Sequence, residues 1–356
     1  MMKLLEKGPG FQSGLADLPK HLNGSTISAG LISTVFGCTG PCLVTAAAAA
    51  AAGFTLEETV TWIFGIYVFG GLLGVILATY YKMPISGAYS IPGATLMGTA
   101  LAGYSFNEAA FAFIIAGVIV LAIGLTGAIG KIMKFLPLEI VMAMVAGAMM
   151  KFGAGIVTTT TGNPLVCGAA VLAFFLVPRI IKKCPAVVAA LIVGFVVAFV
   201  SGQFTADLSG MSYIAPQIVI PKFNAQLILS CSIPLAALVM GAENAQAMGV
   251  LKTEGYDVPA NAMTVWSGVG GIISGLFGAH NANIAGPMTA ICASSETGPK
   301  EGRYAASVVN GLTFALFGVV GVYAITFVGG FPAGLANCLA GLAMMNVLIG
   351  SLKSAF

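Results

Sequence analysis

Long apolar runs separated by short polar connections dominate the chain. Residues 60–81, 109–129 and 186–200 are nearly continuous apolar stretches. About 20 such residues cross the hydrocarbon core of a bilayer as a helix, whereas strands of a membrane barrel alternate apolar and polar positions. The runs do not alternate, so the pattern predicts an all-α polytopic membrane protein. About twelve spans are expected, near residues 26–52, 57–80, 84–101, 108–130, 137–157, 164–180, 185–202, 226–251, 261–279, 282–296, 303–327 and 331–350.

Composition agrees with this pattern. The chain is 58% hydrophobic and 8% charged, and its mean hydropathy is +0.99. A soluble domain has about 25% charged residues. The seven cysteines form no paired CxxC motifs, so we expect no metal site. The net charge of +3 gives no reason to expect a nucleic-acid partner. A membrane-embedded enzyme would need a catalytic cluster such as HExxH, and the sequence has none, so no enzymatic activity is expected.

The basic residues predict an orientation. Of the 15 lysines and arginines, all but Lys151 and Lys222 fall in connections on one side of the predicted spans. An excess of lysine and arginine marks the cytoplasmic loops of a membrane protein. Both termini are therefore expected in the cytoplasm.

Two predicted spans, 84–101 and 282–296, differ from the others. Both are short, and proline stands beside glycine in each, as Pro92-Gly93 and Gly286-Pro287. Proline removes a backbone donor and glycine relaxes a helix, so both spans should be broken. Interrupted segments in matching positions of two halves point to the binding site of a transporter. The two spans lie seven apart, and an odd repeat length inverts the second copy.

Each broken span is expected to be extended first and to become a half-length helix near Gly93 or near Ala285-Gly286. The free N–H groups of such a helix start bind anions. The alternative is that these glycines serve tight helix packing. The candidate substrate-binding residues are Tyr89, Ser90, Ile91, Gly93, Ala94 and Thr95 in the first segment, and Asn281, Ala282, Asn283, Ile284, Ala285 and Gly286 in the second.

Glu243 is the residue that points most strongly to a functional site. It lies nine residues before Lys252, a boundary residue, and therefore roughly 13 Å inside the membrane. A carboxylate there costs at least ~2.5 kcal/mol unless it is protonated, paired or hydrated. We interpret Glu243 as a proton-coupling residue facing a substrate cavity. The alternative is a carboxyl group satisfied by neighbouring helices. Gln246, one turn later, either binds substrate or fixes this carboxyl group.

Two further positions are candidates. Thr39-Gly40-Pro41 should kink the first span and place Thr39 near the ligand. His280 is expected at the outer edge of the second broken span. It would act there as a proton relay or as a satisfied interfacial histidine.

Four segments carry a family resemblance. YKMPISGAYSIPGATLMGTAL, AENAQAMGVLKTEGYDVP, NIAGPMTAICASSETGP and GLANCLAGLAMMNVLIGSL resemble the bacterial benzoate–proton symporter family. More distantly, the layout is similar to the nucleobase–proton symporters, such as the uracil transporter. The resemblance implies a seven-plus-seven inverted-repeat fold with core and gate domains, in which the substrate lies between two half-helices preceded by short strands.

The resemblance also implies a function. It predicts a secondary active transporter in the inner membrane that takes up a small aromatic carboxylate such as benzoate by alternating access. The proton would be the coupling ion, without another cofactor, and the protein would be a homodimer. The core domain would comprise 1–135 and 222–327, and the gate domain 136–204 and 328–356.

Two departures keep alternatives open. Family members usually carry two more spans after the position of Phe356, so either the chain is shortened or its gate is smaller. They also usually have glutamine at the position of Glu243, whereas a glutamate is typical of nucleobase symporters. Nucleobase uptake, and anion exchange of the sulfate-transporter type, therefore remain alternative functions.

Overall fold

A computed structural model describes residues 5–129, 153–181, 186–206, 212–332 and 334–355, with a few single positions between them. The described chain is mainly helical. Most of the predicted span 137–157 lies outside the described residues. The principal helices are α1 (Phe11–His21), α2 (Gly24–Cys38), α3 (Gly40–Ala52), α4 (Leu56–Tyr81), α5 (Ile91–Ala100), α6 (Phe106–Leu125), α9 (Val166–Ile180), α10 (Ala186–Val200), α11 (Ala225–Leu227), α12 (Ile233–Leu238), α13 (Ala245–Thr253), α14 (Ala260–Gly275), α15 (Gly286–Ala293), α16 (Tyr304–Val319), α17 (Gly321–Gly329) and α18 (Leu335–Ala355).

Three helices in the described part of the chain are long and apolar enough to cross a bilayer by themselves. They are α4, α6 and the continuous helix Ala225–Thr253, which includes α11, α12, α13 and two π-helical turns. A fourth crossing results if the bent pair α16 and α17 is counted as one span. The multi-pass character is thus supported, whereas the number of twelve spans stays a prediction.

Two expected spans are not single helices. Residues 26–52 divide into α2 and α3 at Thr39, where φ is −100° and ψ is −102°, and Pro41 opens the second helix. This confirms the kink predicted from Thr39-Gly40-Pro41, because a proline inside a helix would leave a carbonyl unpaired. Residues 303–327 bend by 91° between α16 and α17, just before Gly321. No proline marks this second bend in the sequence.

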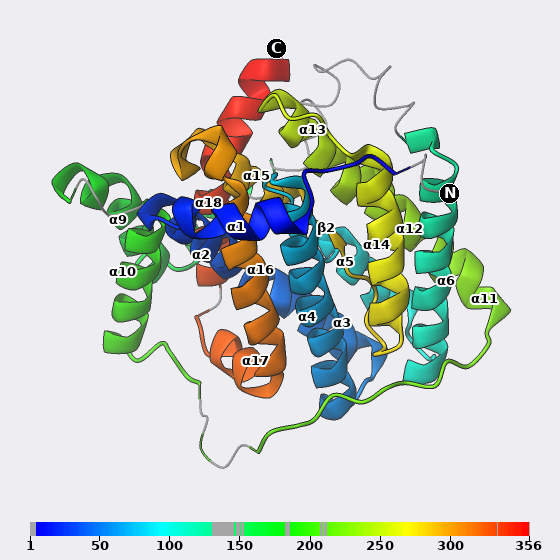
Figure 1. Ribbon diagram of the computed structural model, residues 1–356. Helices are drawn as coiled ribbons and strands as arrows, with labels where there is room; N and C mark the ends of the chain where they lie inside the picture. The colour runs from blue at the N-terminus through cyan, green and yellow to red at the C-terminus, as the bar shows by residue number, and fades with distance from the viewer. Residues whose placement is uncertain are drawn as a thin grey trace.

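Glycines bring the central helices into backbone contact. In Figure 1, α4 and α16 stand side by side, and so do α6 and α14. A Cβ on Gly311 would lie 2.5 Å from the carbonyl oxygen of Gly71, and one on Gly117 would lie 2.6 Å from the backbone nitrogen of Ile272. Small residues allow such close approach in membrane helices, where packing replaces the hydrophobic effect. The helices around the centre are therefore locked against each other.

A two-stranded antiparallel sheet lies at this centre. Strand β1 (Gly87–Ala88) pairs with β2 (Asn283–Ile284), with Gly87 opposite Ile284 and Ala88 opposite Asn283. Helix α5 follows β1, and α15 follows β2. The extended stretches and half-length helices expected in the two broken spans are present. Because the strands run antiparallel, the two units have opposite directions.

Helices α9, α10 and α18 form a separate hydrophobic cluster. Val166 and Phe174 of α9 pack with Ala190 of α10 and with Leu335 and Leu339 of α18. In Figure 1, α9 and α10 lie at the edge of the molecule, away from α4 and α14. These helices come from the two segments assigned to the gate domain. The division into core and gate domains stays a prediction.

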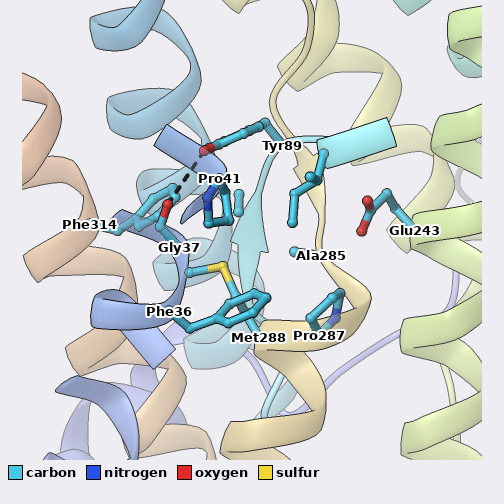
Figure 2. Close-up of a pocket in the computed structure, with 11 residues that line it drawn as sticks. Phe36, Gly37, Pro41, Tyr89, Glu243, Ala285, Pro287, Met288 and Phe314 are labelled. Carbon is cyan, nitrogen blue, oxygen red and sulfur yellow. Dashed lines mark hydrogen bonds between the residues drawn. The ribbon is translucent and has the colours of Figure 1, made fainter. Parts of the chain in front are cut away.

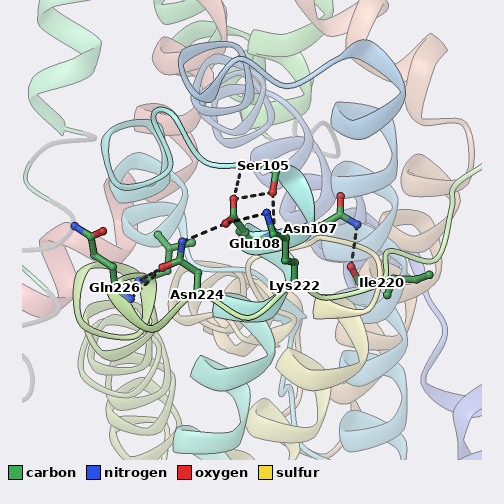
Figure 3. Close-up of polar contacts among 8 residues, drawn as sticks. Ser105, Asn107, Glu108, Ile220, Lys222, Asn224 and Gln226 are labelled. Atoms are coloured by element: carbon green, nitrogen blue, oxygen red, sulfur yellow. Dashed lines mark hydrogen bonds and ion pairs between the residues drawn. The ribbon is translucent and has the colours of Figure 1, made fainter.

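An extended connection crosses the end of the bundle before α11. The Asn107 side chain donates to the Ile220 carbonyl at 2.8 Å, and the Lys222 backbone nitrogen donates to the Asn107 carbonyl at 2.9 Å. Glu108 accepts from Asn224 at 3.3 Å and pairs with Lys222 at 3.6 Å, as Figure 3 shows. Lys222, one of the two basic residues on the minority side, is thus paired at the start of α6.

The N-terminal segment supplies a missing helix cap. Pro259, which precedes α14, makes no side-chain cap, and the Glu6 carboxylate instead accepts from the backbone nitrogens of Asn261 at 3.1 Å and Ala262 at 3.0 Å. A carboxylate satisfies two otherwise orphaned donors there and favours the positive end of the helix dipole. Glu6 thereby ties the N-terminal segment to a central helix.

We predict that Glu6→Ala lowers the free energy of unfolding by about 0.5–2 kcal/mol, the usual effect of losing an N-cap. Glu6→Gln is the matched control, because its amide oxygen still accepts one of the two bonds. Thermal unfolding in detergent measures the difference. Equal melting temperatures for wild type and Glu6→Ala would show that the cap has no effect.

Candidate functional site

Ser90 is the junction between the two broken segments. It is the N-cap of α5, and its Oγ accepts from the Gly93 backbone nitrogen at 3.1 Å. Its own backbone nitrogen donates to Asn281 Oδ1 at 3.3 Å, and its carbonyl lies 2.9 Å from His280 Nε2. Ser90 is fully buried. The start of α5 is therefore held in place by the residues that lead into β2.

His280 bridges three elements and has a defined tautomer. The Trp62 indole of α4 donates to His280 Nδ1 at 2.9 Å, so Nδ1 accepts and carries no proton. Nε2 must then carry the proton that it donates to the Ser90 carbonyl. His280 is fully buried. The expectation of a satisfied histidine is confirmed, because both ring nitrogens have partners. Its place at the outer edge of the span stays a prediction.

A pocket opens beside the two strands, where both half-helices begin. The space among its lining residues is about 230 Å³, its open side included. The part that the centre of a water-sized sphere can reach is about 10 Å³, roughly the space that one water molecule needs, so a larger solute requires the pocket to widen. In Figure 2, Glu243 stands on one side and Phe36, Gly37 and Phe314 stand on the other. The lining residues are Phe36, Gly37, Pro41, Ala88, Tyr89, Ile91, Glu243, Ala285, Pro287, Met288 and Phe314.

Glu243 meets the start of α15. Its Oε2 accepts from the Gly286 backbone nitrogen at 3.3 Å, and its side chain is buried, with 3% of the residue exposed. A Cβ on Gly286 would lie 2.5 Å from the amide carbon of Gln246, so the Gln246 side chain packs directly on this peptide. The absence of a side chain at Gly286 lets both residues reach the helix N-terminus. Glu243 therefore occupies the position that an anion would take there.

Aromatic side chains form the opposite wall. The Tyr89 and Tyr67 hydroxyl groups are 2.9 Å apart, and Tyr67 donates to the Gly37 carbonyl at 2.7 Å. Gly37 precedes the break between α2 and α3, where backbone carbonyls lose their helical partners. The Phe314 ring stacks near Tyr89, with centroids 6.2 Å apart. This wall offers ring faces to a flat solute, and Glu243 faces it.

The structure brings four of the fifteen predicted site residues to the pocket wall. Tyr89, Ile91, Ala285 and Glu243 line it. Gly286 contacts Glu243 and Gln246, as described. Asn281 donates to Asn283 at 2.9 Å and does not line the pocket. Six further predicted residues are buried without lining it: Ser90, Gly93, Ala94, Ala282, Asn283 and Ile284.

Three expectations need correction. The backbone nitrogens of Gly93 and Ala94 are not free, because they donate to the Ser90 side chain and carbonyl. Thr95 is exposed, and its hydroxyl donates to the Ile91 carbonyl at 3.2 Å. Thr39 lies at the helix break, but its hydroxyl turns back to the Val35 carbonyl at 2.8 Å and it does not line the pocket.

Sequence reasoning missed most of the apolar wall. Phe36, Met288 and Phe314 stand in apolar helices and carry no local signal that separates a pocket residue from a core residue. Pro41 and Pro287 did carry a signal, because each stands at a predicted break. Prolines at a helix break are therefore better candidates for lining the pocket than nearby residues with a hydroxyl group.

Comparison with solved structures places this fold among membrane transporters. The transmembrane domain of a cyanobacterium bicarbonate transporter, BicA, matches with a TM-score of 0.51 at 14% identity, over 94% of this chain and 97% of that one. SLC26A9 matches with a TM-score of 0.52 at 14% identity, over 95% of this chain and 60% of that one. At this identity the likeness shows the fold alone. The class that the fold defines is a helical membrane protein.

The family is shown by sequence. Residues 20–356 match the model of the benzoate membrane transport protein family, and the chain belongs to that family. The inner membrane protein YdcO of Escherichia coli is 29% identical over 331 residues, which is 93% of this chain and 84% of YdcO. The benzoate membrane transport protein of Acinetobacter baylyi is 26% identical over 332 residues, with the same coverage. This is a family of membrane transporters, not of enzymes.

We predict that His280 positions the start of α5 and carries no coupling proton. His280→Ala should destabilise the protein by about 1–3 kcal/mol for each buried group left unpaired, on Trp62 and on Ser90. His280→Gln keeps a donor and an acceptor, so it should restore part of the stability and leave the pH dependence of transport unchanged. Thermal unfolding and uptake into proteoliposomes at several pH values measure both effects. A flattened pH profile in His280→Gln would contradict this assignment.

Proposed function

We propose that this protein takes up a small aromatic carboxylate such as benzoate together with a proton. One observation carries the proposal: a buried carboxyl group, Glu243, faces an aromatic wall across a small pocket at which two half-helices begin. An aromatic ring would lie against Tyr89 and Phe314. Its carboxylate would point to the start of α15. The name of the Acinetobacter baylyi relative supports benzoate as the solute.

Coupling follows from competition for one backbone donor. Glu243 holds the Gly286 N–H at 3.3 Å. An ionised Glu243 both occupies this donor and repels an incoming anion. A protonated Glu243 repels no anion and can itself donate a hydrogen bond to the substrate. Substrate and proton then favour each other's binding, and by linkage the effect is reciprocal.

Alternating access would follow from movement of the two predicted domains. The glycine contacts between α4 and α16 and between α6 and α14 would keep the helices around the pocket in fixed relative positions. Helices α9, α10 and α18 pack in their own cluster and would form the opposing surface. A rigid site that moves against a second helical group exposes the substrate to each side in turn.

Nucleobase uptake is the second candidate, and Glu243 is the observation that favours it. A carboxylate can accept from the N–H groups of a flat neutral ring, and the aromatic wall would hold such a ring equally well. The two candidates differ in charge. An anionic substrate should bind more tightly as the pH falls, whereas a neutral substrate that donates to ionised Glu243 should bind more weakly.

We predict that Glu243→Gln abolishes coupling but keeps binding. In proteoliposomes with an imposed inward proton gradient, accumulation of benzoate above the level in protein-free liposomes should be lost, because an uncoupled carrier only equilibrates its solute. The wild-type affinity should rise by up to about tenfold for each pH unit of acidification while Glu243 titrates, and this dependence should vanish in the variant. Glu301→Gln, which changes an exposed carboxylate, is the control. Concentrative uptake by Glu243→Gln at the wild-type rate would refute the assignment.

A second prediction tests the aromatic wall. A Cβ on Gly37 would lie 2.6 Å from Met288 Cε and 2.7 Å from Phe314 Cε2. Gly37→Ala should push these side chains into the pocket and weaken ligand binding by about 1–3 kcal/mol. Gly241→Ala is the matched control, because a Cβ there meets nothing within 4 Å.

The readout is a thermal-shift panel of benzoates, nucleobases and inorganic anions, because bound ligand stabilises the folded state. Benzoates should stabilise the wild type and Gly241→Ala, and should stabilise Gly37→Ala less. Stabilisation of the wild type by nucleobases alone would replace the first candidate with the second. A homodimer, implied by the resemblance, stays a prediction.

A further inference from the structure

Helix α1 is a surface helix that the apolar pattern of the sequence did not indicate. In Figure 1 it runs crosswise over the upright helices α4 and α16. One face is fixed to the protein: the Tyr304 hydroxyl donates to the Gly14 carbonyl at 2.8 Å, and the Gly10 nitrogen donates to the Tyr80 carbonyl at 3.0 Å. Leu18 packs against the cluster of Tyr304 and its neighbours.

An apolar stripe borders this packed face. Phe11 and Leu15 are 46% and 59% exposed and lie four residues apart on the same side of the helix as Leu18. Leu22, 41% exposed, follows the helix as its extended C-cap residue, and the edge of the Phe11 ring contacts Tyr80 at 5.2 Å between centroids. The stripe continues into α2, where Ile27 and Leu31 are 41% and 43% exposed. Helix α2 is itself apolar, although its 15 residues are fewer than a full span needs. The exposed apolar side chains therefore continue from α1 onto an apolar helix.

The depth of α1 follows from α4. At 1.5 Å per residue, the 26 residues of α4 extend ~39 Å, which exceeds the hydrocarbon core of about 30 Å. The ends of α4 therefore reach the headgroup layers. Helix α1 is fixed to the last turn of α4 by the Tyr80 contact and by the Lys82–Asp17 ion pair at 2.7 Å. It accordingly lies at the boundary between lipid and water.

The ion pair at this boundary persists at neutral pH. Hydrogen bonds from Lys20 and Lys82 lower the pKa of the Asp17 carboxyl group from its ordinary 3.8 to about 2. Lys20 is 71% exposed and lies on the side of the helix away from Phe11 and Leu15. A helix with an apolar stripe and a charged opposite edge suits a bilayer interface.

We propose that α1 lies in the plane of the membrane, with Phe11, Leu15 and Leu22 inserted among the lipid acyl chains. The occupant of this surface is the bilayer itself, not a second copy of the chain or a soluble partner. Through Glu6, Asp17 and Tyr304, the helix then fixes the depth of α4, α14 and α16 in the membrane.

The test uses the whole protein in proteoliposomes made from lipids with brominated acyl chains, which quench tryptophan on contact. Leu15→Trp places the probe in the stripe, and Lys20→Trp is the matched control at an exposed position of the same helix. Emission of the wild type, from Trp62 and Trp266, is subtracted. The added emission of Leu15→Trp should be quenched at least about twofold more than that of Lys20→Trp, because an interfacial helix inserts its apolar face by ~5–10 Å.

Equal quenching at both positions would overturn the proposal. So would an added emission from Leu15→Trp that resists bromine but changes with the ratio of protein to lipid, since this would identify a second copy as the occupant. Both positions are exposed, and Lys20→Trp removes the Lys20–Asp17 pair but leaves the Lys82–Asp17 pair that ties α1 to α4.

Discussion

The need to pair every backbone group away from water governs this structure. Two segments leave the helical conformation at the centre of an apolar bundle, and no water is available there to take their N–H and C=O groups. Strands β1 and β2 pair with each other, and the side chains of His280, Asn281 and Thr289 take groups of Ser90 and Ser86 that the short sheet cannot reach. The pocket exists because this pairing holds two half-helix starts side by side.

Proline and glycine made the interrupted segments visible in the sequence. Pro92-Gly93 and Gly286-Pro287 each mark a half-helix within two residues of its observed start, because proline is favoured in the first turn of a helix. The bend before Gly321 has no proline beside its glycine, and residues 303–327 were expected to form one span. Helix α1 was also missed, since its apolar positions are too few to stand out in a search for spans. A bend that results from packing against other helices leaves no signal in the neighbouring sequence.

The same distinction applies to the candidate site: some of its residues carried a signal in the sequence and others did not. Glu243 was recognisable because an ionisable residue in a span is costly, and it lines the pocket. Phe36 and Phe314 were not recognisable, because an aromatic residue in an apolar helix serves a core or a pocket equally well. The first helix start was expected to offer free donors, and Ser90 takes them instead. A serine before a helix start is a capping residue first, and that role removes the donors from a ligand.

The glycine contacts among the central helices carry a consequence for how such carriers diversify. Because Gly311 and Gly117 admit no side chain, the frame that holds the strands cannot be enlarged or reshaped by small steps. The pocket wall is different, since Met288 and Phe314 contribute to it through side chains and not through a backbone contact between helices. A substitution that alters the choice of solute is therefore tolerated more easily in the pocket wall than at the close helix contacts. Relatives with little overall identity could share one mechanical frame and yet sort different solutes.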